Sequence, residues 1–320
     1  RVTAAGGGRG MCYGWRWGVV RLGVALGGTK VEAAVLSVDG HFLFRERLAT
    51  PQGDYSATLA TIATLIQRAE SELQIMWNSV GVGHPGSADP GTGRIRNANS
   101  TCLNGQRLQA DLQALLKRPI RLANDADCLA LSEATDGAAH RCSSVFGVIL
   151  GTGVGGGWVI HGQLLQGPNG LSGEWGHNPL PIATADERPG PRCYCGKYGC
   201  IEAWLSGPAL VADYQRSTGD MSPTAVPMLV SAASQNNAAA VACLDRHTQR
   251  LARALAVVIN TCDPEAIVLG GGVSQRPGLI PGLLAALPAH VFLPPETPLR
   301  TKILLPAFGD SSGVRGAARL

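Results

Sequence analysis

Long hydrophobic runs are absent from this sequence of 320 residues. No stretch approaches the roughly eighteen consecutive apolar residues of a membrane-spanning helix, and the apolar segment 15–26 is interrupted by Arg16 and Arg21. Residues 1–18 also lack the apolar core of a signal peptide. We therefore predict that no membrane is a partner, and that residues 1–19 form an extension outside the fold.

Clustered positive charge is absent as well. The formal net charge is +4, and no run of about five or more lysines and arginines occurs. Such a distribution leaves no electrostatic footprint for nucleic acid or for an anionic membrane surface. Small anionic ligands remain compatible with it.

The composition is that of a globular protein, with 45% hydrophobic residues, 16% charged residues and 42 glycines. The length fits one large or two medium domains. Nine cysteines are an odd number, and Cys193, Cys195 and Cys200 crowd into one short loop, which indicates a metal site rather than a disulfide framework. This pattern favours a reducing compartment, so we expect a cytoplasmic protein.

Two stretches share a layout of β-rich run, glycine turn and β-rich run, which suggests a duplicated unit. Residues 22–38 surround Gly27-Gly28-Thr29, and residues 145–160 surround the cluster at 151–156. Such glycines allow a turn with positive φ and a close approach to a ligand, and exposed N–H groups in the turn bind anions. Each cluster alone could simply make a hairpin. Together the two could grip one polyphosphate.

Helical and strand patterns alternate along the chain. Apolar residues at three- and four-residue steps predict an amphipathic helix over 59–73, before a buried strand at 79–83. A second such helix over 244–259 precedes the apolar strand 266–269 and the glycines 270–272. The alternation predicts an α/β fold of two similar lobes, with a ligand-binding cleft between them.

We place the boundary between the lobes near residues 122–124. The first lobe is predicted to comprise 20–122 plus about 306–320, which fold back onto it, and the second lobe to comprise 123–305 with the cysteine loop. Residues 218–240 are rich in small and polar side chains and are interpreted as a surface excursion.

A metal site is the most specific local signal. His177, Cys193, Cys195 and Cys200 supply one imidazole and three thiolates, the ligand set of a closed tetrahedral zinc site. Three buried free thiols are the alternative, but the glycines and charged residues between them indicate a tight exposed loop. Four protein ligands leave no position for water, so the predicted zinc is structural.

Two carboxylates flank this metal site. Glu174 lies three residues before His177, and Glu202 lies two residues after Cys200. Metal binding would bring them together, and an ionised carboxylate accepts hydrogen bonds from adjacent sugar hydroxyls. Taken singly, each could also be a solvated surface charge.

Asp125 follows the alternating residues 120–123, at a predicted strand end where the cleft opens. A carboxylate there can take the proton of a sugar hydroxyl as its oxygen attacks phosphorus. Asn124 could align the same hydroxyl. From spacing alone, an Asx cap of a helix over 128–134 is an equal alternative.

These segments, in this order, resemble the ROK family of sugar kinases and repressors from Gly23 to the C-terminus. The resemblance rests on Gly27-Gly28-Thr29-Lys30, residues 122–125, 151–157 and 173–177, and the loop 193–202. Residues 97–105, 176–181 and 309–317 look most like bacterial fructokinases of the manno(fructo)kinase type.

The resemblance implies an actin-like, hexokinase-type (ribonuclease H-like) pair of lobes, Mg-ATP as the phosphoryl donor, a hexose as the acceptor, and a homodimer. By position, Asp125 would be the general base, and His177 would bind zinc through one ring nitrogen and face the sugar with the other. The implied sugar-binding residues are Asn99, Asn124, Asp125, Glu174, His177 and Glu202. The implied nucleotide-binding residues are Gly27, Gly28, Thr29, Lys30, Gly151, Thr152, Gly153, Gly271 and Gly272.

Two residues depart from the family pattern. The first motif of the family reads Asp-x-Gly-Gly-Thr, and Ala25 stands at the Asp position, so a carboxylate that would hold the hydrated magnesium is missing. Losing such a preorganised group costs about 2 to 4 kcal/mol of transition-state stabilisation, which predicts a slow kinase. A catalytically impaired sugar-binding protein is the rival. His84 replaces a usually aliphatic residue and could change the sugar fit.

The reaction predicted from this resemblance is in-line transfer to the 6-hydroxyl of fructose or a related hexose. Mannose, glucose and N-acetylated sugars remain alternatives, because selection among them depends on single hydroxyls. The repressors of the family carry a helix-turn-helix region in front of the lobes. The residues before Gly23 show no basic helical pattern, so a kinase is predicted over a repressor.

Overall fold

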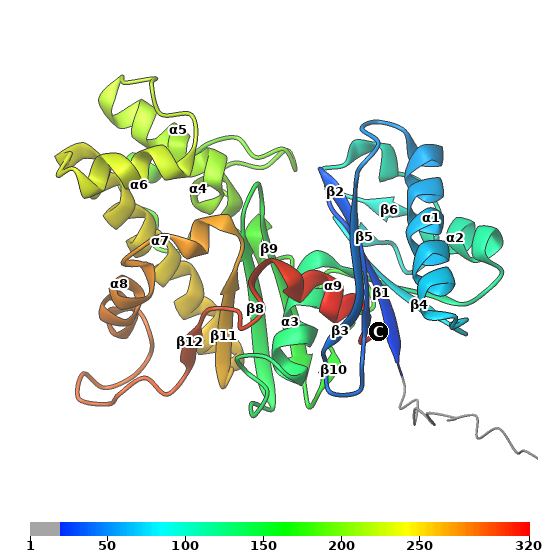
Figure 1. The fold of residues 1–320 in the computed structure, drawn as a ribbon. Coiled ribbons are helices and arrows are strands. Elements are labelled where there is room, and N and C mark those ends of the chain that lie inside the picture. The colour runs from blue at the N-terminus through cyan, green and yellow to red at the C-terminus, as the bar shows by residue number, and fades with distance from the viewer. Residues whose placement is uncertain (1–19) are drawn as a thin grey trace, which may run out of the picture.

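A computed structural model describes residues 20–320, arranged as two lobes side by side (Figure 1). The predicted extension 1–19 lies outside the described residues. Each lobe is built on one five-stranded mixed sheet with helices against it. The predicted α/β architecture is therefore confirmed.

The first sheet has the strand order β3-β2-β1-β4-β7. Its strands are β1 (Arg21–Leu26), β2 (Lys30–Leu36), β3 (Phe42–Ala49), β4 (Val80–His84) and β7 (Ile120–Asn124). The first three strands are antiparallel, and β4 and β7 run parallel to β1. A small hairpin of β5 (Ser87–Ala88) and β6 (Ile95–Arg96) follows β4.

Helices α1 (Tyr55–Leu73) and α2 (Leu108–Leu116) belong to this lobe. The predicted amphipathic pattern is confirmed in α1, which buries Ile62, Leu65 and Ile66 in the core of the lobe. The helix begins where the Asp54 carboxylate accepts a hydrogen bond from the backbone N–H of Ala57 at 2.9 Å.

The second sheet has the order β10-β9-β8-β11-β12. Its strands are β8 (Ser144–Leu150), β9 (Val154–Ile160), β10 (Gln163–Leu164), β11 (Ala266–Gly270) and β12 (Lys302–Leu304). Again three antiparallel strands are followed by two that run parallel to the first of them. The common order of the two sheets confirms the duplicated unit read from the glycine turns.

The outer helices of the second lobe are α4 (Glu202–Leu205), α5 (Gly207–Thr218), α6 (Val226–Ser234), α7 (Ala238–Cys262) and α8 (Leu279–Ala286). Residues 218–240, interpreted as a surface excursion, are mostly exposed, and they contain α6 and the start of α7. Leu229 is buried and anchors α6, and the Asn237 side chain caps α7. The small side chains of this segment suit close helix packing as well as they suit a loop.

Helices α3 (Asp125–Thr135) and α9 (Ser312–Ala317) lie between the two sheets (Figure 1). The contact of α9 with the first sheet is very close, since a Cβ atom at Gly81 would lie 1.8 Å from the carbonyl oxygen of Ala317. The fully buried Glu133 of α3 accepts hydrogen bonds from Ala307 N at 2.9 Å and from Ser312 Oγ at 2.7 Å. The C-terminal segment therefore packs against β1 and β4, while the exact division of the chain into lobes stays a prediction.

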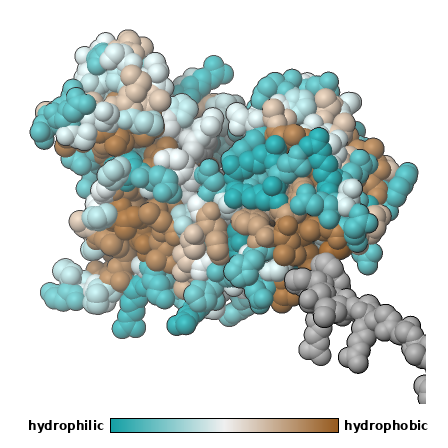
Figure 2. Space-filling view, viewed as in Figure 1, coloured by the Kyte–Doolittle hydropathy of each residue, from teal (hydrophilic) through white to brown (hydrophobic). Residues whose placement is uncertain are grey.

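Charged side chains cover β3, the edge strand of the first sheet, and hydrophilic surface gathers over this strand (Figure 2). Arg45 and Arg47 both pair with the buried Glu32 of β2, Arg47 at 2.9 Å. Charges of this kind protect an open edge from pairing with another strand. Among residues 20–320, no helix is both long and apolar enough to cross a bilayer.

Candidate active site in the interlobe cleft

A cavity of about 330 Å³ opens between the lobes, where β7 ends and where β8 turns into β9. Its lining includes side chains of both lobes. The predicted site residues that line it are Asn99, Asn124, Asp125, Thr152, Gly153, Glu174, His177 and Glu202. The structure thus brings together all six predicted sugar-binding residues, although they are spread over more than 100 residues of the chain.

Asp125 is the first residue of α3 and opens onto this cleft. The helix cap is its neighbour Asn124, whose side chain accepts from the backbone N–H of Asp127 at 2.7 Å. Asp125 Oδ1 accepts from Ala126 N at 2.9 Å, which leaves Oδ2 for a ligand. A capping role and a cleft-facing carboxylate therefore occur together, on adjacent residues.

The pKa of Asp125 is raised to about 6. Crowding by both lobes removes part of the water around the carboxylate, and this desolvation outweighs the backbone hydrogen bonds that favour the charged form. Glu174 adds a smaller repulsion. A carboxylate with a pKa in this range can accept a proton near neutral pH.

Glu202 joins the glycine turn of the second sheet to the cysteine loop. Its Oε2 accepts a hydrogen bond from Val154 N at 2.8 Å. A Cβ atom at Gly153 would lie 2.6 Å from the same oxygen, so a side chain there would displace the carboxylate from this position. Its other oxygen lies 3.9 Å from Cys193 Sγ.

Four potential metal ligands cluster at the rim of the cleft. The ligand atoms of His177, Cys193, Cys195 and Cys200 all lie within 4.8 Å of one another. Cys193 Sγ is 3.6 Å from His177 Nδ1, and Cys195 Sγ is 3.6 Å from Cys200 Sγ. The chain can hold a metal ion here.

The other ring nitrogen of His177 points toward Tyr194, with Nε2 3.0 Å from the phenolic oxygen. Tyr194 also lines the cleft. This residue was not among the predicted site residues, although its place between Cys193 and Cys195 was the available signal. Asn97, which lines the cleft too, was likewise missed despite standing in one of the resembling segments.

Glu174 begins a 3-10 turn at Trp175–His177 that is fastened to β9. The indole Nε1 of Trp175 donates to the carbonyl oxygen of Gly155 at 3.0 Å. Burial raises the pKa of Glu174, which the charge of His177 partly offsets. The turn thereby holds Glu174 and His177 facing the same cavity.

A second cavity of about 150 Å³ adjoins the first and is lined by Gly27, Gly28 and Lys30. Asn99, Pro85 and Asp125 line both cavities. Asp125 therefore stands between a space large enough for a sugar and the turn predicted to hold phosphate.

The Gly27–Lys30 turn lies beside this second cavity, which Gly27, Gly28 and Lys30 line. Gly27 N donates to Lys30 O at 2.9 Å, and Thr50 Oγ1 donates to Gly27 O at 2.8 Å. Within the described part of the chain, the N–H groups of Gly28 and Thr29 have no acceptor. They remain able to bind an anion.

The positive φ expected of the glycine turns was wrong for Gly27, Gly28, Gly151 and Gly153, none of which has it. At Gly153 the glycine leaves space for the Glu202 carboxylate, which a side chain would displace.

Ala25 lines the second cavity, at the carboxyl end of β1. The nearby carboxylate of Glu32 is held by Arg45 and Arg47 and cannot replace the missing one. Asp310 also lines this cavity, 3.9 Å from Lys30 Nζ, and is highly exposed. Since Asp125 is the predicted base, Asp310 is the carboxylate of this cavity that stays available to a cation.

Four predicted nucleotide-binding residues do not line these two cavities, namely Thr29, Gly151, Gly271 and Gly272. Gly271 has φ of 86° and backs onto β8, where a Cβ atom would lie 2.3 Å from Leu150 O. Gly151 accepts from Gly207 N at 2.8 Å, at the start of α5. These glycines lie along the end of the second sheet, next to the cleft.

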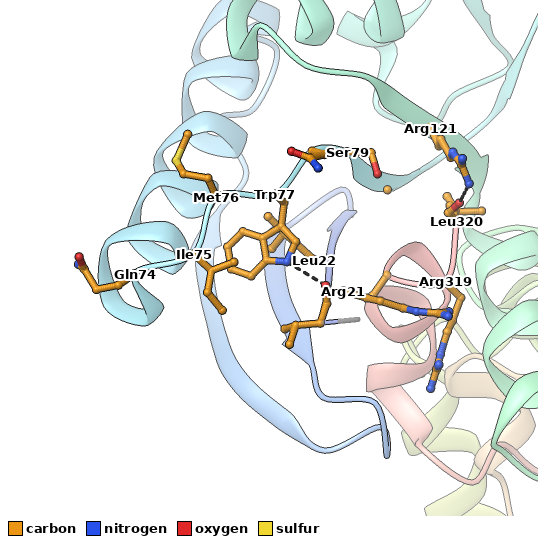
Figure 3. Close-up of a pocket in the computed structure, with 14 residues that line it drawn as sticks. Arg21, Leu22, Gln74, Ile75, Met76, Trp77, Ser79, Arg121, Arg319 and Leu320 are labelled. Carbon is orange, nitrogen blue, oxygen red and sulfur yellow. Dashed lines mark hydrogen bonds between the residues drawn. The ribbon is translucent and has the colours of Figure 1, made fainter. Parts of the chain in front are cut away.

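A separate hollow of about 740 Å³ lies at the opposite, amino ends of β1, β4 and β7 (Figure 3). Trp77 forms part of its wall, and Arg121 points toward Leu320 and donates to its oxygen. Arg319 is paired with Asp136. None of the predicted site residues lines this hollow, so the chemistry is assigned to the cleft.

Comparison with known proteins agrees with this geometry. A model of the ROK family matches residues 21–320. The N-acetyl-D-glucosamine kinase of Shigella flexneri serotype 5b is 36% identical over 302 residues, which cover 93% of this chain and 98% of that protein.

Solved structures are similar over nearly their whole length. The ROK hexokinase of Thermus thermophilus has a TM-score of 0.82 and 29% identity, covering 94% of this chain and 97% of that one. A ROK family glucokinase of Streptomyces griseus, in complex with glucose and AMPPNP, has a TM-score of 0.77 and 26% identity, with 94% and 98% covered. The predicted hexokinase-type pair of lobes is thus confirmed.

Proposed function

This chain belongs to the ROK family as a sugar kinase, and we propose that it transfers the γ-phosphoryl group of ATP to the 6-hydroxyl of a hexose, with Asp125 as the general base. The hexose would occupy the larger cavity and the phosphates the smaller one. Asn99, Asn124, Glu174, His177 and Glu202 would surround the sugar.

The position of Asp125 carries this proposal. Its carboxylate lines both cavities, keeps Oδ2 available, and has a pKa of about 6. A base in that place can take the hydroxyl proton while the oxygen attacks phosphorus. The N–H groups of Gly28 and Thr29 would stabilise charge on the phosphoryl oxygens.

N-acetyl-D-glucosamine is our first candidate for the acceptor, supported by a relative of that name at 36% identity over nearly the whole chain. Fructose is the second, favoured by the segments that resemble manno(fructo)kinases. Fructose is a ketose with its anomeric centre at carbon 2, whereas N-acetylglucosamine is an aldose with an acetamido group on carbon 2, so the shape of the pocket around carbons 1 and 2 decides between them.

We further propose that the cluster of His177 and three cysteines holds a structural zinc. Four ligands at about 2.0 to 2.3 Å from a tetrahedral zinc lie roughly 3.4 to 3.8 Å apart, and two separations here are 3.6 Å. When bound, such a zinc supplies rigidity and no reactive water. The residues themselves would hold Glu202 and Tyr194 beside the sugar.

Mg²⁺ bound with ATP, a homodimer and a cytoplasmic location belong to the same proposal. Magnesium would be carried mainly by the phosphates, because Ala25 offers no ligand. Light scattering of the purified protein would test for the dimer.

An ADP-release assay with magnesium, across N-acetylglucosamine, fructose, glucose and mannose, tests the function. We expect turnover with at least one of these sugars. Calorimetric binding of a sugar without ADP release would instead favour the catalytically impaired alternative. If none of the sugars binds and none causes ADP release, the proposal is wrong.

A further inference from the structure

A third cavity, of about 250 Å³, lies behind the sugar site and shares the walls formed by Asn124 and Glu174. We call it the side pocket. Its remaining lining comes from both lobes: His84, Ser87, Ala88, Pro90, Leu122, Ala123, Asp127, Leu165, Gln166, Gly167, Gly170 and Ser172. A sugar held by Asn124 and Glu174 would therefore have this space next to its ring.

Contacts between the lobes lie next to the lining residues Ala88 and Gly170 of the side pocket. Arg96 of β6 pairs with Asp89 at 3.0 Å and also donates to the carbonyl oxygen of Asn169 in the second lobe. At Gly170, a Cβ atom would lie 2.9 Å from the carbonyl oxygen of Ala88. The pocket is thus bordered by both lobes, and it shares Asn124 and Glu174 with the sugar site.

His84 gives the side pocket its chemical character. The side chain is only 1% exposed, and Nδ1 lies 3.0 Å from the carbonyl oxygen of Pro85. Nδ1 must carry the proton to make that bond, and burial lowers the pKa of the ring, which keeps it neutral. Nε2 is then a pure acceptor, and no described residue donates to it.

A second acceptor belongs to Asp127, whose Oδ1 is buried without a partner. Burial raises the pKa of Asp127 to about 7. Ala88, Leu122 and Leu165 add apolar wall. Buried acceptors without donors cost stability unless a ligand or water supplies the donors, so the pocket suits a group that combines an N–H donor with an apolar end.

We propose that the side pocket receives the acetamido group on carbon 2 of an N-acetylated hexose, with His84 Nε2 accepting its amide N–H. This inference rests on the proposed function, because it needs the sugar ring in the cleft. A hydroxyl at carbon 2 would be too short to fill the pocket. His84 would then be the residue that selects N-acetylated over plain hexoses.

The test compares wild type, His84→Leu and His84→Gln, each with N-acetylglucosamine and with glucose. Sugar affinity is measured by calorimetry, and kcat/KM by ADP release. We expect His84→Leu to weaken the binding of N-acetylglucosamine about tenfold or more, since the lost hydrogen bond leaves the amide unpaired. The affinity for glucose should change less than about threefold. His84→Gln keeps an acceptor and should restore most of the loss.

The outcomes separate the two proposals. A wild-type protein that phosphorylates glucose but binds N-acetylglucosamine more weakly overturns the side-pocket inference and leaves the kinase intact. Equal losses for both sugars in His84→Leu, or no loss for either, overturn it as well, provided that thermal melting shows a folded variant. If the affinities follow the expected pattern but no sugar is phosphorylated, the side-pocket inference is supported and the proposed kinase activity is wrong.

Discussion

The carboxylate of Glu202 accepts a hydrogen bond from the backbone N–H of Val154 at 2.8 Å. This bond ties the end of the cysteine loop to the glycine turn between β8 and β9. Through it, the cluster of metal ligands and the predicted nucleotide-binding turn share one carboxylate. A displacement of the cluster or of the turn would therefore shift this carboxylate and, through it, the other segment.

Replacing Gly153 tests this coupling. In Gly153→Ala the new methyl would lie 2.6 Å from Glu202 Oε2 and must displace the carboxylate. We expect kcat/KM to fall about tenfold or more, because small displacements in a site are costly. Gly91→Ala is the control, since its nearest neighbour is 3.5 Å away in an exposed turn. Unchanged kinetics in Gly153→Ala would show that Glu202 has no positioning role.

The proton-accepting role of Asp125 predicts the behaviour of Asp125→Asn. The amide keeps the shape of the side chain and can still bond a hydroxyl, but it cannot take a proton. We expect turnover to fall at least about a hundredfold, with sugar affinity by calorimetry changed little. Retained turnover would remove Asp125 from this role.

The raised pKa of Asp125 predicts a pH profile. The base must be ionised, and its pKa is raised to about 6, mainly by desolvation. kcat/KM should therefore be level above roughly pH 7 and fall as pH drops through about 6, approaching tenfold per unit. Glu174 repels the ionised form, so Glu174→Gln should move the midpoint to lower pH. A flat profile down to pH 5 would contradict the assignment.

Ala25 predicts a gain of function. Ala25→Asp places a carboxylate on the lining of the phosphate cavity, where magnesium is expected. We expect kcat to rise tenfold or more, which corresponds to about 1.4 kcal/mol. Magnesium titration should show half-saturation at lower concentration. An unchanged rate would mean that other groups, such as Asp310, already position the magnesium ion.

The cysteine cluster predicts metal content. Purified protein should carry about one zinc per chain by elemental analysis. Cys200→Ser should lose the metal, lower the melting temperature and weaken sugar binding, since the loop would no longer hold Glu202. Cys262→Ser, an exposed cysteine outside the cluster, is the matched control. A Cys200→Ser protein with full zinc and full sugar affinity would refute the site.

Local patterns determined much of what the sequence predicted correctly. The apolar spacing of α1 and the buried strand β4 follow from the periodicity of helix and strand, which depends on neighbours only a few residues away. The clustering of the candidate metal ligands was predicted for the same reason, because Cys193, Cys195 and Cys200 lie in one loop. Tyr194 was missed although it lies between two of these ligands, because its place in the loop does not say that its ring lines the cleft.

Tertiary structure alone decided how distant segments meet. The bond from Val154 to Glu202 spans 48 residues, and the bond from Ser312 to Glu133 spans 179. Neither has a local signature, since each depends on how whole strands and helices pack. The raised pKa of Asp125 and the enclosure of His84 arise in the same way: burial comes from the approach of the two lobes, and no spacing of residues along the chain encodes how much water that approach removes.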